Sequence, residues 1–222
     1  DSVTSLTFGG ASTQTITLAA MTAVSHFDAS TATGAVGLTL INQSSLLAAQ
    51  DLSVSGGTAG DTLNVSAHTQ SNISVNGGEG NDTITHTAIV VGETVDGGDG
   101  TDILSTTSAR AQILDAATPT TYTITNLETL SISDQFNGGI LATQNIATSI
   151  DKVVVANSAA DASLLGAATT IVGGAGEFTV DLGSANAANT ARVLAFGLTV
   201  TDTGTATDDS VTLVNKSTVS TT

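Results

Sequence analysis

Hydrophobic residues recur through the middle of the chain at a step of about 20 residues. One set lies two residues before each of three glycine pairs: Val54, Val75 and Val95. A second set lies seven residues after the first glycine of each pair: Leu63, Ile84 and Leu104. Because glycine pairs are costly inside helices, this pattern predicts strands joined by turns, one coil of a solenoid per repeat.

We therefore expect an all-β fold, a right-handed parallel β-solenoid of the β-roll or β-helix type. Equivalent residues of successive coils would stack about 4.8 Å apart, so that each apolar set forms an internal ladder. We expect right-handed coils because connections between parallel strands are almost always right-handed. We divide the chain into an N-terminal β-rich flank (1–50), the coils with the glycine pairs (51–106) and a C-terminal β-rich region (107–222) that continues the solenoid.

Polar and apolar residues also alternate outside the regular repeats. Alternation predicts strands at 127–133, 153–155, 198–200 and 211–214. Two stretches that mix alanine with polar residues, 108–117 and 184–192, favour short helical turns.

The composition excludes several classes of function. The 222 residues carry 20 acidic side chains against 4 Lys and Arg, a net charge of −16. Such a chain is unsuited to nucleic acid or to insertion in a membrane, and no apolar run approaches the ~20 residues of a membrane span. The absence of cysteine excludes disulfides and thiolate metal sites. An acidic protein can, however, bind hard cations, which prefer oxygen ligands.

The glycine turns carry acidic residues in register. Asp61, Asp82 and Asp102 each follow a glycine pair by the same number of residues, and the coil model stacks them. Carboxylates ~4.8 Å apart repel each other by roughly 3–4 kcal/mol at an effective dielectric of 20. A divalent cation between successive turns reverses that repulsion, and glycine lets backbone carbonyls point at such an ion. Carboxylate and carbonyl oxygens are the ligands of Ca²⁺.

These turns resemble the RTX nonapeptide Gly-Gly-x-Gly-x-Asp-x-U-x of calcium-binding parallel β-rolls. GGEGNDTIT at 77–85 and GGDGTDILS at 97–105 match every fixed position, whereas GGTAGDTLN at 56–64 has Ala59 in place of a glycine. The resemblance implies two Ca²⁺ sites along one edge of the solenoid. The metal ligands it implies are Asp61, Asp82 and Asp102, with the carbonyls of Gly57, Gly78, Gly80, Gly98 and Gly100.

The Thr-, Ala- and Ser-rich flanks resemble bacterial surface-layer proteins of the RTX type. This resemblance implies a structural, non-enzymatic Ca²⁺-binding protein, exported by type I secretion to the bacterial cell surface, that self-associates into a lattice. A cell-surface polysaccharide would contact another part of the chain. The alternative is a segment of a secreted RTX adhesin, acting as a spacer or a ligand-binding module. An accessory domain of a secreted enzyme is a further alternative, although no catalytic motif is visible.

A calcium-dependent ice-binding solenoid would show an outward Thr-x-Thr ladder. The pairs Thr15 and Thr17, Thr83 and Thr85, and Thr121 and Thr123 do not recur at the coil step, so we interpret them as solvent-facing strand residues.

His26, His68 and His86 fall outside the coil frame and are expected to be exposed rather than metal ligands. Glu79, Glu93 and Asp96 either complete a site through water or are ordinary surface acids.

Overall fold

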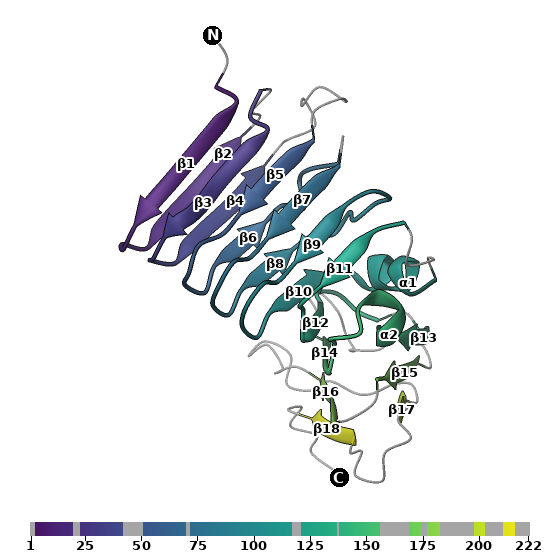
Figure 1. Cartoon of the computed structure of the whole chain (residues 1–222). Helices are drawn as coiled ribbons and strands as arrows, with labels where there is room; N and C mark the ends of the chain where they lie inside the picture. The colour runs from purple at the N-terminus through teal and green to yellow at the C-terminus, as the bar shows by residue number, and fades with distance from the viewer. Residues whose placement is uncertain are drawn as a thin grey trace, which may run out of the picture. The chain divides into compact units, whose positions relative to one another are not determined.

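The computed structural model describes residues 3–19, 23–41, 51–69, 72–116, 121–136, 138–155, 169–174, 177–182, 198–202 and 211–215. These residues form a parallel β-solenoid with little helix (Figure 1). The predicted fold is thus confirmed, while its right hand stays a prediction. The chain divides into a first unit, Asp1–Leu104 with Pro119–Leu127, and a second unit, Ser105–Thr118 with Glu128–Thr222.

Two parallel sheets build the first unit. One contains β1 (Ser5–Gly10), β3 (His26–Ala32), β5 (Leu52–Ser55), β7 (Ile73–Asn76), β9 (Thr94–Asp96) and β11 (Thr123–Thr125). The other contains β2 (Gln14–Ala19), β4 (Val36–Ile41), β6 (Thr62–Asn64) and β8 (Thr83–Thr85), followed by β10 (Ile103–Thr106), in which the boundary between the units falls. Each coil contributes one strand to each sheet.

Apolar ladders fill the narrow space between the two sheets. In the first sheet the ladder consists of Leu6, Phe27, Val54, Val75, Val95 and Ile124, which are register partners in that order. In the second it consists of Ile16, Leu38, Leu63 and Ile84, with Leu104 fully buried on the neighbouring strand β10. Both predicted ladders are therefore confirmed. Small aliphatic side chains suit an interior too thin for many aromatic rings.

Small polar side chains line the outer surface of the second sheet. The register places Thr15, Gly37, Thr62 and Thr83 in one row, and Thr17, Thr39, Asn64 and Thr85 in the next. The Thr-x-Thr pair does not recur from one coil to the next, as predicted, although Thr15 and Thr83 lie in the same row. Gly37 and Asn64 interrupt the ladder.

The second unit repeats the parallel arrangement. One set of strands consists of β12 (Thr129–Ile132), β14 (Lys152–Val155), β16 (Phe178–Leu182) and β18 (Val211–Asn215), and the other of β13 (Gly139–Ala142), β15 (Thr169–Gly173) and β17 (Leu198–Asp202). The four strands predicted from alternation are present. Parallel strand pairing therefore also occurs beyond the glycine-pair repeats.

Two short helices also belong to the second unit. Helix α1 (Ser108–Ala116) confirms the first predicted helical stretch, and the hydroxyl of Thr107 accepts the N–H of Arg110 at its start, as a capping residue does. Helix α2 (Thr143–Ile146) was not predicted. The stretch 184–192 lies outside the described residues. Among those that are described, no helix is long and apolar enough to span a membrane.

Candidate cation site

The three aspartates of the glycine turns form a directional hydrogen-bond ladder across the coils. The N–H of Asp61 donates to Oδ1 of Asp82 over 2.6 Å, and the N–H of Asp82 donates to Oδ1 of Asp102 over 2.7 Å. The N–H of Val36 donates in the same way to Oδ1 of Asp61, at 2.7 Å. The structure thus brings the predicted aspartates together, and one oxygen of each bonds to the coil on its N-terminal side.

All three carboxylates lie inside the solenoid rather than on its rim, with exposed fractions of 2% for Asp61, 1% for Asp82 and 0% for Asp102. The pKa of Asp82 departs from that of an ordinary aspartate. Burial raises its pKa to about 7, and the charges of Asp61 and Asp102 act in the same direction. Its Oδ2 atom is buried and has no hydrogen-bond partner among the described residues. Burying a carboxylate oxygen without a partner is costly, which makes Asp82 the best candidate for an unsatisfied metal ligand.

Left-handed glycines shape the second and third turns. Gly78 and Gly80 have φ angles of 106° and 110°, and their equivalents Gly98 and Gly100 have 97° and 148°. These turns also lie too close together for side chains: a Cβ at Gly98 would meet the carbonyl oxygen of Gly78, and one at Gly100 would meet that of Gly80. Only glycine combines this backbone conformation with such close stacking.

Carbonyl and carboxylate oxygens converge beside the first glycine of the second turn. A Cβ at Gly77 would collide with both the carbonyl oxygen of Gly97 and the carboxylate of Asp82. The absence of a side chain at Gly77 therefore lets an oxygen of the next coil and the Asp82 oxygen that has no partner pack against the same backbone position. This is the mixture of ligands that a hard cation requires.

The first turn differs from the other two. Gly57 does not adopt the left-handed conformation of Gly78 and Gly98, and its N–H donates to Oδ2 of Asp61 over 2.6 Å. Both oxygens of Asp61 therefore already accept backbone hydrogen bonds. This turn is also the one in which Ala59 replaces a motif glycine. Of the predicted pair of sites, the one between the second and third turns has the geometry better suited to a cation.

A hollow of about 230 Å³ lies on the outside of the first and second turns. The residues that line it are Ser30, Ser55, Gly56, Gly57, Thr58, Asn76, Gly78 and Glu79. Two of the predicted ligands, Gly57 and Gly78, thus border a surface rich in oxygen atoms. Their carbonyls accept the N–H groups of Glu79 and Asp99, and each carbonyl oxygen retains a second lone pair.

Within the described part of the chain, no three His, Cys, Asp or Glu side chains lie close enough together to hold a metal ion. A cation at these turns would therefore depend on backbone carbonyls, with Asp82 as its principal charged ligand. The residues fit Ca²⁺, which accepts neutral oxygens, and they do not fit Zn²⁺, which prefers His and Cys.

Asn126 closes the glycine stack on its C-terminal side, and the sequence motif gave no sign of this. It has a φ angle of 51°, its side-chain N–H donates to Oδ1 of Asp96 over 2.8 Å, and its carbonyl oxygen packs where a Cβ of Gly97 would lie. Asparagine tolerates the left-handed conformation better than other residues with a side chain. This could have indicated a turn in the sequence TNLET, but not its place on the stack.

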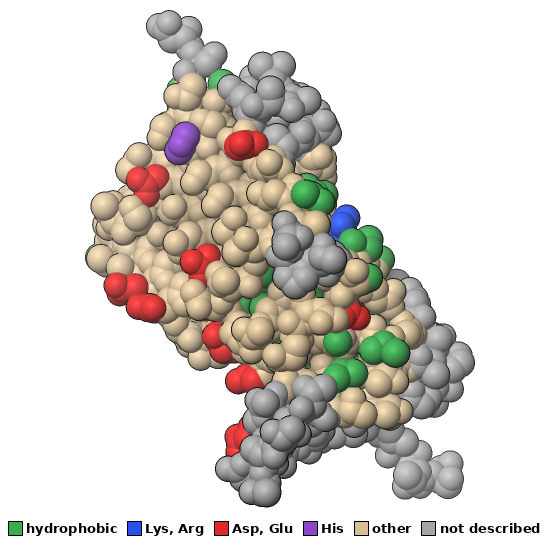
Figure 2. Space-filling model, turned by 45° about the vertical axis from the view of Figure 1, so that its right-hand side comes forward, with side chains coloured by type: hydrophobic (Ala, Val, Ile, Leu, Met, Phe, Trp, Pro, Cys, Tyr) green, Lys and Arg blue, Asp and Glu red, His purple; other side chains and the backbone are tan. Residues whose placement is uncertain are grey.

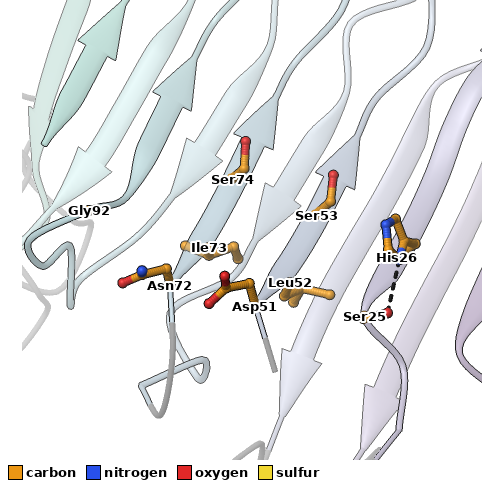
Figure 3. A pocket seen from close by; sticks show the side chains of 9 residues that line it. All are labelled: Ser25, His26, Asp51, Leu52, Ser53, Asn72, Ile73, Ser74 and Gly92. Carbon is orange, nitrogen blue, oxygen red and sulfur yellow. Dashed lines mark hydrogen bonds between the residues drawn. The ribbon is translucent and has the colours of Figure 1, made fainter. Parts of the chain in front are cut away.

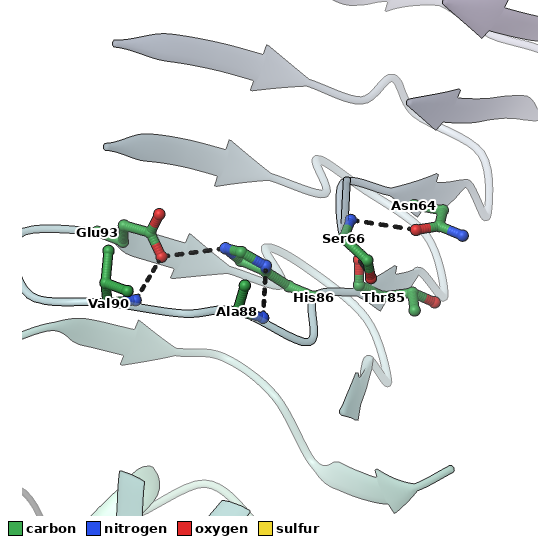
Figure 4. A network of polar contacts seen from close by, with 7 residues as sticks. All are labelled: Asn64, Ser66, Thr85, His86, Ala88, Val90 and Glu93. Carbon is green, nitrogen blue, oxygen red and sulfur yellow. Dashed lines mark hydrogen bonds and ion pairs between the residues drawn. The ribbon is translucent and has the colours of Figure 1, made fainter. Parts of the chain in front are cut away.

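A buried hydrogen bond between His86 and Glu93 stabilises the loop before β9 (Figure 4). Nε2 of His86 lies 3.0 Å from Oε2 of Glu93, which also accepts the N–H of Val90 over 2.7 Å. The expectation that His68 and His86 are exposed is wrong: both are 0% exposed, and Glu93 is only 2% exposed. His86 lies two residues after Ile84, so its side chain faces inward like its neighbour in the ladder. His26 is exposed, as predicted.

A second hollow, of about 260 Å³, lies at the starts of β3, β5 and β7 (Figure 3). Ser53 and Ser74 project beside it from neighbouring strands, and His26 accepts or donates a 2.9 Å hydrogen bond with Ser25. Asp51 supplies its single carboxylate.

The chain matches no model of a protein family, no curated protein and no solved structure.

Proposed function

We propose that the chain binds Ca²⁺ at its glycine and aspartate turns and that the ion stiffens the solenoid. The observation that carries this proposal is the buried Asp82 carboxylate, which has one oxygen without a partner and a carbonyl oxygen of the next coil close to it. A protein does not bury such a group without compensation. A divalent cation supplies that compensation.

The chain's own residues would perform two tasks. The left-handed glycines hold successive turns in contact, and Asp82 provides negative charge between them. A bound Ca²⁺ would supply positive charge and further oxygen coordination there. Because an ion that binds only the folded chain stabilises it, calcium would raise the free energy of unfolding.

We further propose that the protein is a structural element of a bacterial surface layer, outside the cell. The composition supports this: the chain is acidic and without cysteine, and most of the surface in Figure 2 is neither hydrophobic nor charged. The stacked coils provide a repetitive scaffold in which each repeat supports its neighbour. Self-association into a lattice would follow from contacts between such elements.

Calorimetric titration with Ca²⁺ tests the binding proposal. We expect Asp82→Asn to abolish or strongly weaken the best site, and Asp61→Asn to have the smaller effect, because both oxygens of Asp61 are already hydrogen-bonded. Equal calcium affinity and stoichiometry in the wild type and Asp82→Asn would contradict the proposal.

Electron microscopy with calcium and with a chelator tests the biological role. Ordered sheets that form only with calcium would support the surface layer. Isolated particles under both conditions would favour the alternative of an adhesin segment.

A further inference from the structure

Asn76 is followed by Gly77 at the second glycine turn, an order of residues that favours an intramolecular reaction. Asn76 is the last residue of β7, which lies between β5 and β9 in the first sheet (Figure 1), and its side chain is exposed to water. Its register partners are Ser55 at the first turn and Asp96 at the third. Because the side chain at this position differs in each coil, the fold does not require an amide there.

An asparagine that precedes glycine can react with its own backbone, because glycine has no side chain to hinder the approach. The nitrogen of Gly77 attacks Cγ of Asn76 and closes a succinimide ring. The bond from Cγ to Nδ2 breaks, and Nδ2 leaves as ammonia with the proton of the Gly77 N–H. Water then opens the ring. Cleavage at Cγ gives aspartate, whereas cleavage at the original peptide carbonyl gives isoaspartate, whose backbone is longer by a CH₂ group.

The stacked coils oppose this reaction in the folded chain. The N–H of Gly77 donates to the carbonyl oxygen of Asp96 over 2.9 Å, and the carbonyl oxygen of Asn76 accepts the N–H of Gly56 over 2.8 Å. The peptide unit between Asn76 and Gly77 is therefore hydrogen-bonded to a coil on each side. Gly77 is also buried, and a Cβ there would meet the carbonyl oxygen of Gly97. The nitrogen of Gly77 cannot turn toward Cγ of Asn76 unless these contacts break.

We propose that Asn76 is a deamidation site protected by the stacking of the coils, which reacts when the second glycine turn opens and not while the turn is closed. Opening of a single turn is a local event that costs less than unfolding of the whole chain. Aspartate at position 76 repeats the arrangement of Asp96 and Gly97 in the third turn, so it is compatible with the fold. Isoaspartate lengthens the backbone between the hydrogen bonds to the two neighbouring coils, so the turn cannot close in register.

Peptide mapping by mass spectrometry tests the proposal, after incubation of the protein in one calcium-containing buffer, either folded or unfolded by guanidinium chloride. Conversion of an amide to a carboxyl group raises the mass, and chromatography separates aspartyl from isoaspartyl peptides. We expect Asn76 to deamidate in the denaturant and at least about tenfold more slowly in the folded protein, because the reaction then waits for local opening. Asn64 and Asn81 are internal controls that should react more slowly than Asn76 in the denaturant, since Val65 and Asp82 follow them.

Asn76→Ser copies Ser55 of the first turn and provides the matched variant. It should be folded by circular dichroism and show no mass gain at this position. The other Asn-Gly pair of the sequence, 137–138, whose asparagine lies outside the described residues, gives the reference rate in denaturant.

Chains with isoaspartate at position 76, purified from the denatured sample and refolded, should unfold at a lower denaturant concentration than Asn76→Asp. Equal rates at Asn76 in the folded and the unfolded protein would overturn the proposal. The same holds if Asn76 does not react in denaturant, or if isoaspartyl chains are as stable as Asn76→Asp.

Discussion

The backbone N–H of Asp82 donates to Oδ1 of Asp102 over 2.7 Å, from one coil to the next. The same contact joins Asp61 to Asp82 over 2.6 Å. The motif aspartate therefore has a structural role in addition to any binding of metal: one of its oxygens accepts a buried N–H of the adjacent coil. Only its other oxygen remains for a cation, and in Asp82 that oxygen has no hydrogen-bond partner among the described residues.

Substitutions at Asp82 should separate these two tasks. Asp82→Asn retains an oxygen that accepts the N–H of Asp61, so without calcium at neutral pH we expect stability equal to or above that of the wild type. Asp82→Ala leaves that N–H unsatisfied and should cost about 1–3 kcal/mol. Urea unfolding in chelator measures both effects. Calcium should stabilise the wild type and have little effect on Asp82→Asn; equal stabilisation of the two proteins would contradict this prediction.

The stability of the metal-free protein should depend on the protonation of Asp82. Its pKa is raised from 3.8 to about 7, so between these values the folded chain holds a proton that the unfolded chain has released. Its contribution to the free energy of unfolding is fully present below pH 3.8 and is lost as the pH rises toward 7. The slope for one proton reaches at most about 1.4 kcal/mol per pH unit.

Other groups titrate in the same range, so the informative quantity is the difference between the wild type and Asp82→Asn. We expect the wild-type free energy of unfolding to fall relative to that of the variant between about pH 4 and pH 7. Parallel pH profiles in chelator would show that Asp82 does not titrate in this way.

Stacking of the turns should make Gly98 intolerant of a side chain. Gly98→Ala introduces both an unfavourable φ of 97° and a collision with the carbonyl of Gly78. Gly10→Ala is a matched control, because Gly10 has a φ of 103° but no atom within 4 Å of the added Cβ. We expect Gly10→Ala to cost about 1–2 kcal/mol from backbone strain alone, and Gly98→Ala clearly more. Similar losses in thermal unfolding would mean that the turns are less tightly stacked than the structure shows.

The buried pair of His86 and Glu93 should contribute strongly to local stability. Glu93→Ala removes the acceptor of both the buried His86 ring and the N–H of the exposed residue Val90. A buried donor left without its acceptor costs about 1–3 kcal/mol. The exposed acid Glu79 offers the control, since Glu79→Ala in chelator should change the free energy of unfolding by less than about 0.5 kcal/mol. Hydrogen exchange should also show faster exchange in the loop before β9 for Glu93→Ala.

Sequence alone was sufficient to predict the repeating coil, its apolar ladders and the stacking of the three aspartates. The physical reason is that a parallel solenoid places residues one period apart directly above each other, so that register follows from counting. Val54, Val75 and Val95 illustrate this, since each is the partner of the next in the finished sheet.

The tertiary structure decided which way the polar groups face and how much water reaches them. It placed His86 and Glu93 in the interior, turned one oxygen of each aspartate to a neighbouring N–H, and made the first glycine turn unlike the other two. Coils of unequal length also aligned Thr15 with Thr83 on one face. None of these follows from the period, because burial and hydrogen bonding depend on the atoms that adjacent coils bring to each side chain.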